Sequence, residues 1–412
     1  KLPALRSVVQ LGPDPAPGAY GFDAVMTMGH KPGRSRLDAI GRSLKPDDPI
    51  NIQFTSGTTG APKGATLSHR NIVNNAISSA RAMRLTPGEG LCIPVPLYHC
   101  FGMVLSTLLC VTHGATMVLP CEYFDPLLVL EGVEKERCTA LHGVPTMFIA
   151  ELEHPEFKRF DLRSLRTGVM AGAPCPIELM RRVNGEMHLA EITIGYGETE
   201  ASPIVTQTLA RDTLERRTET VGPPIPHTEL KVVDPATGSI VPVGEQGEIC
   251  ARGYQIMRGY YNNEKATNEA IDEAGWLHTG DIGLMRPGGA FKITGRIKDM
   301  IIRGGENIYP REIEEFLYAN PKIRDAQVIG VPDRKMGEEI CVWIQLKEGE
   351  RSTEEEIREW CAGRIAHYKI PRYVKFVDEF PMTVTGKIQK FKMREISIRE
   401  LGLQDVAKIK TA

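Results

Sequence analysis

The chain has 412 residues, of which 42% are hydrophobic and 25% charged, and its formal net charge is -2 at pH 7. This length exceeds what a single hydrophobic core usually supports, so we expect at least two domains. The balanced charge argues against a polyanion-binding surface, and nucleic acid is therefore not expected as a partner.

The spacing of cysteine and histidine residues gives no sign of a disulfide or metal framework. The nine cysteines form no Cys-x-x-Cys pair, and no two histidines are four residues apart. Neither a disulfide scaffold nor a zinc site is predicted. Reduced thiols are typical of an intracellular protein, so we expect the cytoplasm, or the mitochondrial matrix if a transit segment precedes these residues.

The apolar stretch from Leu91 to Cys121 is divided by prolines and glycines into pieces too short to cross a bilayer. We expect a buried helix near Met103–Val111 and a strand near Ala115–Leu119 instead, and no transmembrane segment. The sequence opens at Lys1 without a methionine, which indicates a piece of a longer protein whose N-terminal part is absent.

Between Ile50 and Ala210, short apolar strands alternate with amphipathic helices, which is typical of a layered α/β domain. Ile50–Phe54 is expected to form a strand that leads into a Gly/Thr-rich loop, and Ser68 is expected to cap the helix that follows. The loop is therefore predicted to lie between a strand and a helix. From Thr220 to Phe291, short strands separated by turn signals predict a small β subdomain.

A strand at Met300–Ile302 and a helix opened by Pro310 begin a compact α+β domain. The predicted fold class is thus α/β, with a layered large domain, a small β subdomain and a C-terminal α+β domain. The expected boundaries are 1–296 for the large domain, with the β subdomain inside 211–296, then a connection at 297–299 and the C-terminal domain at 300–412.

The strongest chemical signal is a loop rich in hydroxyls and glycine that carries a lysine. Its residues are Thr55, Ser56, Gly57, Thr58, Thr59, Gly60, Ala61, Pro62, Lys63 and Gly64. Backbone N–H groups and hydroxyls in such a loop can converge on anionic oxygens. A Walker A loop requires Gly-Lys-Ser/Thr, which Pro62-Lys63-Gly64 does not provide. An anion-binding loop of another kind is favoured over a flexible surface loop.

This decapeptide resembles the phosphate loop of the adenylate-forming superfamily, which includes acyl-CoA synthetases, luciferases and peptide adenylation domains. Four further segments are similar to that family's motifs and follow in the family's order. They are Tyr196-Gly197-Glu198-Thr199-Glu200, Gly275-Trp276-Leu277-His278-Thr279-Gly280-Asp281, Gly295-Arg296-Ile297-Lys298-Asp299 and Thr385-Gly386-Lys387. Five motifs in order are far more specific than any one of them, and they span nearly the whole chain. The resemblance implies ATP-dependent conversion of a carboxylic acid to an acyl-adenylate.

The resemblance also implies how ATP is bound. Asp281 resembles the aspartate that accepts both ribose hydroxyls, a task that suits a carboxylate with two acceptor oxygens. Tyr196, followed by Gly197, would stack on adenine, and Arg296 would reach the ribose or a phosphate. The opposite wall of the adenine site would be formed by Gly172, Ala173 and Pro174. Without the motif context, each of these is an ordinary turn, packing or surface residue.

Acyl-adenylate formation brings a carboxylate against the α-phosphorus of ATP, so the site must neutralise two anions and the departing pyrophosphate. Glu200 is similar to the family's magnesium-linked glutamate and supplies a hard oxygen ligand for Mg²⁺. Thr199 can donate to the α-phosphate. Lys387 is expected to bridge the attacking carboxylate and the α-phosphate, and thereby to serve the first half-reaction.

The family resemblance further implies a mobile C-terminal domain that rotates between two half-reactions, with Lys298-Asp299 as the hinge. After rotation, the turn at Gly304, Gly305 and Glu306 would face the active site, where glycines permit close approach of the coenzyme A arm. A plain surface hairpin is the alternative interpretation of this turn. No carrier domain follows Lys387, which favours free coenzyme A as the acceptor.

The expected acyl site is mostly apolar and offers no basic group for a second carboxylate, so a simple fatty acid is predicted. Its wall includes His99, His142, Val144 and Val169. His99 would gate the acyl tunnel, or would be a buried hydrogen-bonded histidine. The resemblance is closest to medium- and long-chain fatty acyl-CoA synthetases, including the group called acyl-CoA synthetase family member 2.

The predicted function is therefore that of an acid–CoA ligase acting on a fatty acid, ATP and coenzyme A. Two alternatives remain at this point: an aryl-acid or luciferase-like adenylating enzyme, and a nucleotide-binding module without turnover. Family members normally carry a further N-terminal subdomain, so the activity of this chain by itself is left open, as is its oligomeric state.

Overall fold

The computed structural model describes residues 5–29, 33–55, 62–383 and 387–407. The chain divides into two compact units, residues 1–48 and 49–412. The first unit contains two short parallel strands and two helices, and most of its described apolar side chains are exposed. Its elements are β1 (Val9–Gln10), β2 (Tyr20–Gly21), α1 (Phe22–Met28) and α2 (Arg34–Ser43).

The second unit is built around a six-stranded sheet with the order β10-β9-β8-β7-β5-β6. Its strands are parallel except β10, which runs antiparallel to β9. They are β5 (Gly90–Cys92), β6 (Thr116–Val118), β7 (Ala140–Gly143), β8 (Thr167–Ala171), β9 (Glu191–Gly197) and β10 (Ile204–Gln207). The α/β layering predicted for this region is confirmed, and β6 matches the strand expected near Ala115–Leu119.

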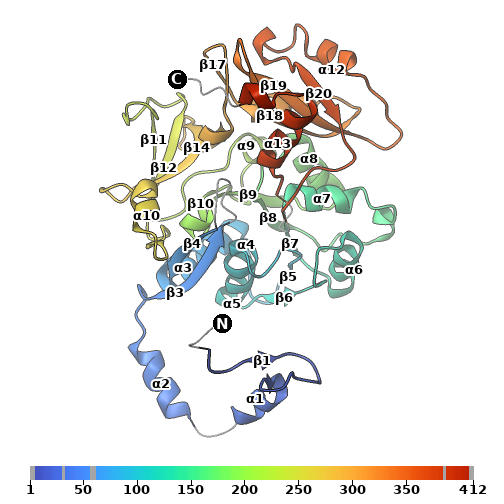
Figure 1. Ribbon diagram of the computed structural model, residues 1–412. Coiled ribbons are helices and arrows are strands. Elements are labelled where there is room, and N and C mark those ends of the chain that lie inside the picture. Colours follow the sequence, from blue (N-terminus) through green and yellow to red (C-terminus); the bar gives the residue numbers. More distant parts are fainter. Residues whose placement is uncertain (1–4, 30–32, 56–61, 384–386, 408–412) are drawn as a thin grey trace. The chain divides into compact units, whose positions relative to one another are not determined.

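Helices cover both faces of this sheet, as a parallel sheet requires. Successive strand residues enter different cores: Val169 packs in one and Met170 in the other. The first core includes α3 (His69–Met83) and the helical run α4 (Cys100–Gly102), a π-helical segment Met103–Leu108 and α5 (Leu109–His113). The second includes α6 (Pro126–Glu136), α7 (Pro145–Leu152) and α8 (Ile177–Glu186). Figure 1 shows α3 and α7 on opposite sides of the central strands.

The helix expected after Ser68 is confirmed as α3. The Ser68 hydroxyl accepts a hydrogen bond from the Asn71 N–H, while the Asn71 side chain accepts one from the Ser68 N–H. This reciprocal cap satisfies two otherwise unpaired donors at the helix start. Among the described residues, no helix is long and apolar enough to span a bilayer.

The Gly/Thr-rich loop is not placed between a strand and a helix, contrary to the expectation from sequence. It connects β3 (Pro49–Thr55) with β4 (Lys63–Ser68), and these strands pair in an antiparallel hairpin in which Thr55 is opposite Lys63. A third strand, β13 (Gly259–Tyr260), pairs with β4, so that the hairpin and β13 form a separate three-stranded sheet. The helix that was expected directly after the loop is α3, which begins only after β4.

The β subdomain predicted between Thr220 and Phe291 is confirmed. It is a four-stranded antiparallel sheet with the order β11-β12-β14-β15. The strands are β11 (Thr228–Val233), β12 (Gly247–Gly253), β14 (Leu277–Met285) and β15 (Phe291–Arg296), and the nearby short helices are α9 (Leu214–Glu219) and α10 (Glu264–Ala270).

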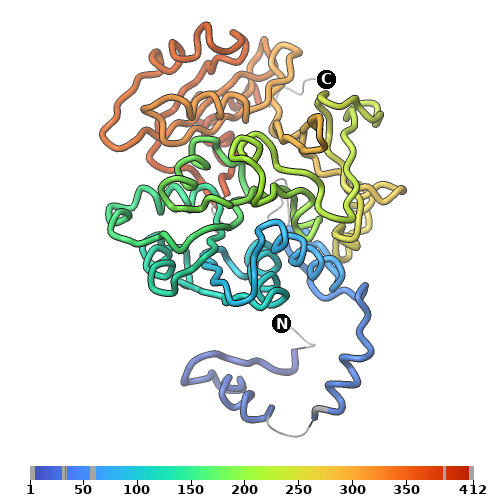
Figure 2. Tube along the Cα trace, turned by 180° about the vertical axis from the view of Figure 1, so that it is seen from behind, coloured from blue at the N-terminus to red at the C-terminus, as the bar shows by residue number. Residues whose placement is uncertain are grey.

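The chain after β15 forms one α+β lobe, coloured orange to red in Figure 2, as predicted. Its sheet contains β16 (Ile301–Arg303), β17 (Glu306–Ile308), β18 (Ile323–Asp333), β19 (Gly337–Leu346) and β20 (Tyr373–Phe376). Its helices are α11 (Pro310–Tyr318), α12 (Glu354–Cys361), α13 (Lys390–Glu400) and α14 (Gln404–Ala407). Pro310 occupies the first turn of α11, where its missing N–H costs nothing.

Candidate active site

Asp281, Tyr196 and Arg296 meet at the edge of the β subdomain. Asp281 on β14 is opposite Arg296 on β15, because the two residues are register partners. The Arg296 Nε lies 2.8 Å from Asp281 Oδ1, and the Tyr196 hydroxyl donates to Asp281 Oδ2 at 2.8 Å. Asp281 is only 3% exposed. Its carboxylate raises the pKa of Arg296, so the guanidinium stays charged.

A second polar chain links Glu200 to Lys63. Glu200 lies in the short 3₁₀ turn Thr199–Ala201, directly after β9. The Tyr260 hydroxyl donates to Glu200 Oε1 at 2.6 Å, and the Lys63 ammonium lies over the Tyr260 ring at 5.0 Å from its centre. Tyr260 was not among the residues singled out from sequence. It arrives here because β13 pairs with β4.

Negative charge is concentrated beside Glu200. Burial raises the pKa of Glu198 well above its usual range, and the carboxylates of Glu200 and Asp281 raise it further, while Arg296 and Lys298 oppose this effect. Such a concentration of carboxylates favours the arrival of positive charge. The residues of the Tyr196–Glu200 segment are therefore brought together with Asp281 around one site.

Lys387 enters this region from the C-terminal lobe. Its N–H donates to Thr383 Oγ1 at 3.1 Å, and its carbonyl accepts from the Thr383 N–H at 2.8 Å. Burial lowers the pKa of Lys387 and the Arg296 charge lowers it further, whereas Cys100, Glu200 and Glu198 act in the opposite direction. The Lys387 ammonium thus lies in a site that also holds acidic groups.

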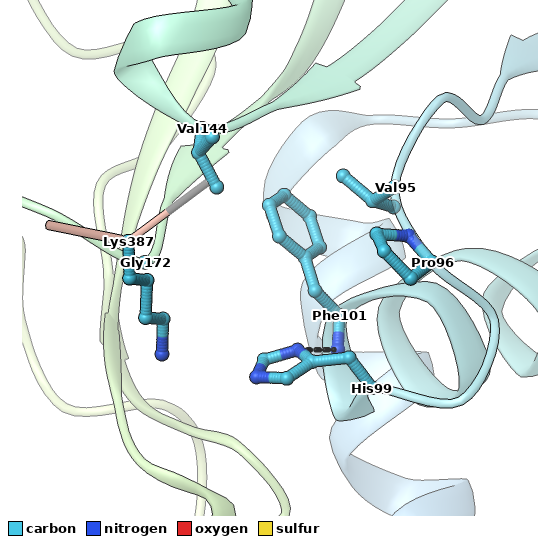
Figure 3. A pocket seen from close by; sticks show the side chains of 7 residues that line it. All are labelled: Val95, Pro96, His99, Phe101, Val144, Gly172 and Lys387. Atoms are coloured by element: carbon cyan, nitrogen blue, oxygen red, sulfur yellow. Dashed lines mark hydrogen bonds between the residues drawn. The ribbon is translucent and has the colours of Figure 1, made fainter. Parts of the chain in front are cut away.

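Lys387 shares a small pocket with residues of the large domain (Figure 3). The lining consists of Val95, Pro96, His99, Phe101, Val144, Gly172 and Lys387. The His99 ring and the Lys387 side chain reach into the same space from opposite sides. Gly172 has φ +89°, and a Cβ there would lie 3.2 Å from Val144 Cγ1 and 3.7 Å from Lys387 Cε. A larger residue at Gly172 would narrow the pocket.

His99 is held as a neutral ring with a defined tautomer. Its Nδ1 accepts a hydrogen bond from the Phe101 N–H at 3.1 Å at the start of α4, so the ring proton resides on Nε2. Burial, followed by the nearby Lys387 charge, lowers its pKa to about 4. At neutral pH, His99 therefore offers the pocket one N–H donor and adds no positive charge to that of Lys387.

The four residues expected to form the acyl wall are divided by the structure. His99 and Val144 line the pocket, whereas His142 and Val169 are fully buried in the strands behind it and are not part of its lining. His142 contacts the Phe101 ring at a centroid distance of 5.3 Å. Val95, Pro96 and Phe101, which were not singled out from sequence, complete the apolar side.

Several residues named from the motifs lie outside the described residues. They are Ser56, Gly57, Thr58, Thr59, Gly60 and Ala61 of the first loop, and Thr385 and Gly386 before Lys387. Thr55 and Lys63, which border the first loop, are described as the facing ends of β3 and β4. Thr199 lies next to Glu200, while Gly172, Ala173 and Pro174 form an exposed loop after β8.

The proposed coenzyme A turn is a tight hairpin. Gly304 and Gly305 connect β16 to β17 with φ of +61° and +88°, a backbone region that favours glycine. A Cβ at Gly304 would also lie 2.6 Å from Met336 Cε. Glu306 is exposed at the start of β17. The expected hinge residue Asp299 lies in a 3₁₀ turn, Ile297–Asp299, between the β subdomain and the C-terminal lobe.

Comparison with known proteins places this geometry in a family context. Residues 13–261 match the model described as AMP-binding enzyme, and residues 312–387 match the AMP-binding enzyme C-terminal domain. The Bacillus subtilis (strain 168) protein YngI is 53% identical over 403 residues, covering 98% of this chain and 73% of that protein. The mitochondrial medium-chain acyl-CoA ligase ACSF2 of Danio rerio is 49% identical over 405 residues, covering 98% of this chain and 67% of that protein.

Among solved structures, ATP-bound MatB from Rhodopseudomonas palustris superposes with a TM-score of 0.79 and 31% sequence identity. The match covers 86% of this chain and 69% of that structure. In each of these three comparisons the chain corresponds to roughly two thirds to three quarters of the other protein's length.

Proposed function

Because the chain belongs to the AMP-binding enzyme family, we propose that it forms the catalytic part of an acid–CoA ligase for medium- to long-chain fatty acids. The reaction class is ATP-dependent activation of a carboxylic acid, with release of pyrophosphate, followed by transfer of the acyl group to coenzyme A. The carrying observation is that Lys387 shares one pocket with His99 and Val144 beside the acidic nucleotide site.

The nucleotide end of the site is supported by the Asp281 contacts. Each carboxylate oxygen can accept more than one hydrogen bond, so ribose hydroxyls can bind Asp281 while Tyr196 and Arg296 hold its orientation. Arg296, which is half-exposed, can exchange this contact for a phosphate. Tyr196 would offer the flat surface of its ring to adenine.

The residues near Glu200 fit a magnesium ion. Glu200 is a hard oxygen ligand whose orientation is fixed by the Tyr260 hydroxyl. Burial raises the pKa of Glu198, and the neighbouring carboxylates of Glu200 and Asp281 raise it further. Glu200 would hold the ion, with Glu198 as a neighbouring carboxylate. When bound, Mg²⁺ would neutralise phosphate charge.

Lys387 would carry the first half-reaction. Its ammonium is poised in a largely apolar pocket, where an electrostatic contact to the incoming carboxylate and the α-phosphate is stronger than in water. His99, neutral and with its Nε2 proton available, would offer a second donor from the opposite side of the pocket. Together these groups would hold the carboxylate for attack.

The acyl preference is supported by the pocket lining and by similarity to a medium-chain acyl-CoA ligase. Val95, Phe101 and Val144 give the acyl side an apolar surface, which favours an alkyl chain over an acid with a second charge. The second half-reaction would follow rotation about residues 297–299, which would bring the Gly304-Gly305 hairpin to the site for coenzyme A.

ATP–pyrophosphate exchange over acetate, octanoate, palmitate, benzoate and amino acids tests this proposal. The assay is run on this chain and on its full-length parent. Exchange confined to octanoate and palmitate is the expected outcome. Exchange with benzoate alone would favour an aryl-acid ligase, and no exchange by the full-length protein with any acid would overturn the fatty-acid assignment.

The Lys387→Ala variant should slow exchange by about 10²–10³-fold, because it removes one preorganised stabilising donor. Exposed Lys392→Ala, from the adjoining helix α13, is the matched control and should retain exchange. Equal rates in the two variants would remove Lys387 from the adenylation step.

We propose that the protein is located in the cytoplasm, with the mitochondrial matrix as the alternative. Imaging of the tagged full-length parent, together with cell fractionation, distinguishes the two.

A further inference from the structure

Three side chains of types that commonly bind metal ions lie close together on the β subdomain, outside the pocket that contains Lys387. Among the residues that the structure describes, Glu248, Cys250 and His278 have donor atoms that all lie within 4.8 Å of one another. Glu248 and Cys250 are two residues apart on β12 and therefore point to the same face. His278 on β14 is the direct register partner of Cys250.

Donor atoms of Glu248 and Cys250 both lie close to one imidazole nitrogen of His278. His278 Nδ1 lies 2.8 Å from Glu248 Oε2 and 3.5 Å from Cys250 Sγ. The pairing of β12 with β14 is irregular between Glu248 and Cys250. Glu248 and Cys250 are buried, whereas His278 is partly exposed and leaves a path from solvent.

When the His278 Nδ1 proton is donated to Glu248, the Cys250 thiol has no hydrogen bond to this nitrogen. The single Nδ1 position carries at most one proton, so it can donate to Glu248 or accept from the Cys250 thiol, but not both. A cation at the centre would satisfy a carboxylate, a thiolate and a neutral imidazole at the same time. This donor set is typical of zinc, while the sulfur and nitrogen donors disfavour magnesium and calcium.

The other ring nitrogen of His278 lies near a carboxylate. His278 Nε2 lies 3.8 Å from Asp272 Oδ2, at the start of the turn that leads into β14. A histidine that binds metal through one nitrogen commonly directs its other N–H to a carboxylate, which fixes the ring and strengthens the ligand. Asp272 is therefore placed to orient His278 without touching the ion.

We propose that Glu248, Cys250 and His278 bind a zinc ion, with Asp272 as a positioning residue. Binding converts the Cys250 thiol to a thiolate that forms a Zn–S bond, and its proton leaves to solvent. His278 binds through Nδ1 as a neutral ring, and a water molecule completes the tetrahedron. Two anionic ligands balance the charge of the ion.

The site is connected to the nucleotide site through the backbone. The second Glu248 oxygen, Oε1, accepts the Gly280 N–H at 3.0 Å, and Gly280 directly precedes Asp281. Thr279 adds a bond from its hydroxyl to the Ile249 carbonyl at 2.7 Å. Zinc on Glu248 would thus stiffen the segment that presents Asp281. This last connection rests on the proposed role of Asp281, whereas zinc binding itself does not.

Equilibrium dialysis of the purified chain against Zn²⁺, with metal quantified by mass spectrometry, tests the site directly. We expect about one tightly held zinc per chain. Cys250→Ser should abolish this binding, whereas Cys361→Ser, a buried free thiol in the C-terminal lobe, should retain it. Asp272→Asn should weaken binding by about 10–100-fold.

Cobalt substitution provides a readout that needs no variant. Bound Co²⁺ should give a thiolate charge-transfer absorption in the wild-type chain, and a chelator should remove it. Absence of zinc binding by the wild-type chain, or equal binding by wild type, Cys250→Ser and His278→Gln, would overturn the proposal. None of these measurements involves turnover, so a failure of the ligase assignment would leave them unaffected.

Discussion

Tyr260 connects two groups that belong to different sequence motifs. Its ring lies under the Lys63 ammonium, and its hydroxyl donates to Glu200, so one aromatic side chain contacts both ends of the phosphate-binding region. Burial and the Glu200 carboxylate raise the pKa of Tyr260, which keeps the phenol protonated as a donor. The orientation of Glu200 therefore depends on a residue far away in sequence.

The Tyr260→Phe variant removes only the hydroxyl. A hydrogen bond to a charged group contributes about 1.5–3 kcal/mol, so we expect the Mg²⁺ concentration needed for half-maximal pyrophosphate exchange to rise about tenfold or more. Tyr261→Phe, at the exposed neighbouring position, is the control and should leave the Mg²⁺ dependence unchanged. An unchanged Mg²⁺ titration in Tyr260→Phe would contradict the assigned contact.

His142 is a buried histidine whose proton position follows from its neighbours. The Ser106 hydroxyl donates to the Phe101 carbonyl at 3.0 Å, so the 3.1 Å contact between Ser106 and His142 Nδ1 requires the ring to donate. Nε2 is then an acceptor, with no hydrogen-bond partner among the residues that the structure describes. Burial lowers the pKa of His142 to about 3.

This lowered pKa predicts a loss of stability in mild acid. His142 binds a proton near pH 6.5 in the unfolded chain but only near pH 3 in the folded chain. Its contribution to the free energy of unfolding is therefore fully present above pH 6.5 and decreases as the pH falls from 6.5 towards 3. At pH 5 the contribution of His142 should have decreased by about 2 kcal/mol. Denaturation at pH 7.5 and pH 5 should show a smaller decrease for His142→Asn than for wild type.

A control for the same experiment is His367→Asn, which alters an exposed histidine. Its free energy of unfolding should decrease between pH 7.5 and pH 5 by the same amount as that of the wild type. If His142→Asn and wild type lose the same stability between the two pH values, His142 is protonated in the folded state or is not the responsible group.

Residues that belong to motifs could be identified from sequence, whereas residues brought together by strand pairing could not. Asp281, Lys387 and Glu200 could be named because each belongs to a recognisable motif. Tyr260 could not, because it reaches Glu200 only through the pairing of β13 with β4. The Glu248, Cys250 and His278 group was equally invisible, since its residues meet across two strands and follow no short metal-binding spacing.

The start of α3 shows which elements can be predicted from local sequence. Ser68 and Asn71 form a reciprocal cap, and Asn71 also donates to the backbone carbonyls of Tyr254 and Ile256. A helix with its own cap and a periodic apolar face can be recognised from local sequence. The phosphate loop was misplaced because its second flank depends on a hairpin rather than on local periodicity.

Removing the cap should loosen the first turn of α3. Ser68→Ala typically costs about 1 kcal/mol, which corresponds to about a fivefold faster amide hydrogen exchange where local opening limits exchange. Mass spectrometry of peptides that cover His69–Met83 measures this change. Asn74→Ala, on the exposed face of the same helix, should leave exchange in the first turn unaltered, and an equal change in both variants would count against the cap.

Contacts between the C-terminal lobe and the large domain define the observed arrangement. Arg324 on β18 forms an ion pair with Glu153 after α7 at 2.8 Å, and Arg311 donates to the Ile293 carbonyl at 2.9 Å. These contacts accompany the entry of Lys387 into the pocket. The arrangement therefore corresponds to the proposed adenylation step.

A charge reversal at this contact should affect one half-reaction selectively. Because exposed ion pairs contribute at most about 1 kcal/mol, Arg324→Glu should slow pyrophosphate exchange by about twofold to fivefold. Acyl transfer to coenzyme A from a supplied acyl-adenylate should be unchanged. The double variant Arg324→Glu with Glu153→Arg should recover exchange; equal loss in both half-reactions would indicate general damage to the fold.

The domain boundary expected after residue 296 remains a prediction, although the α+β lobe itself was predicted well. Its strands and helices carry local signals, such as Pro310 at the start of α11 and Thr353 as the cap of α12. The division of the chain at residue 48 was not predicted, because amino-acid composition does not report how contacts cluster along the chain.

Strand β3 is polar where it faces inward and apolar where it faces solvent. Gln53 is buried and donates to the Tyr98 carbonyl, while Ile50 and Phe54 are 50% and 63% exposed. In the described part of the chain β3 is also the edge of its sheet. Exposed apolar side chains beside unpaired backbone groups promote association of strands from different molecules. Solutions of this chain should therefore become turbid as the protein concentration rises. Kinetic assays should be run on dilute samples, because scattered light from aggregates would disturb the measurement.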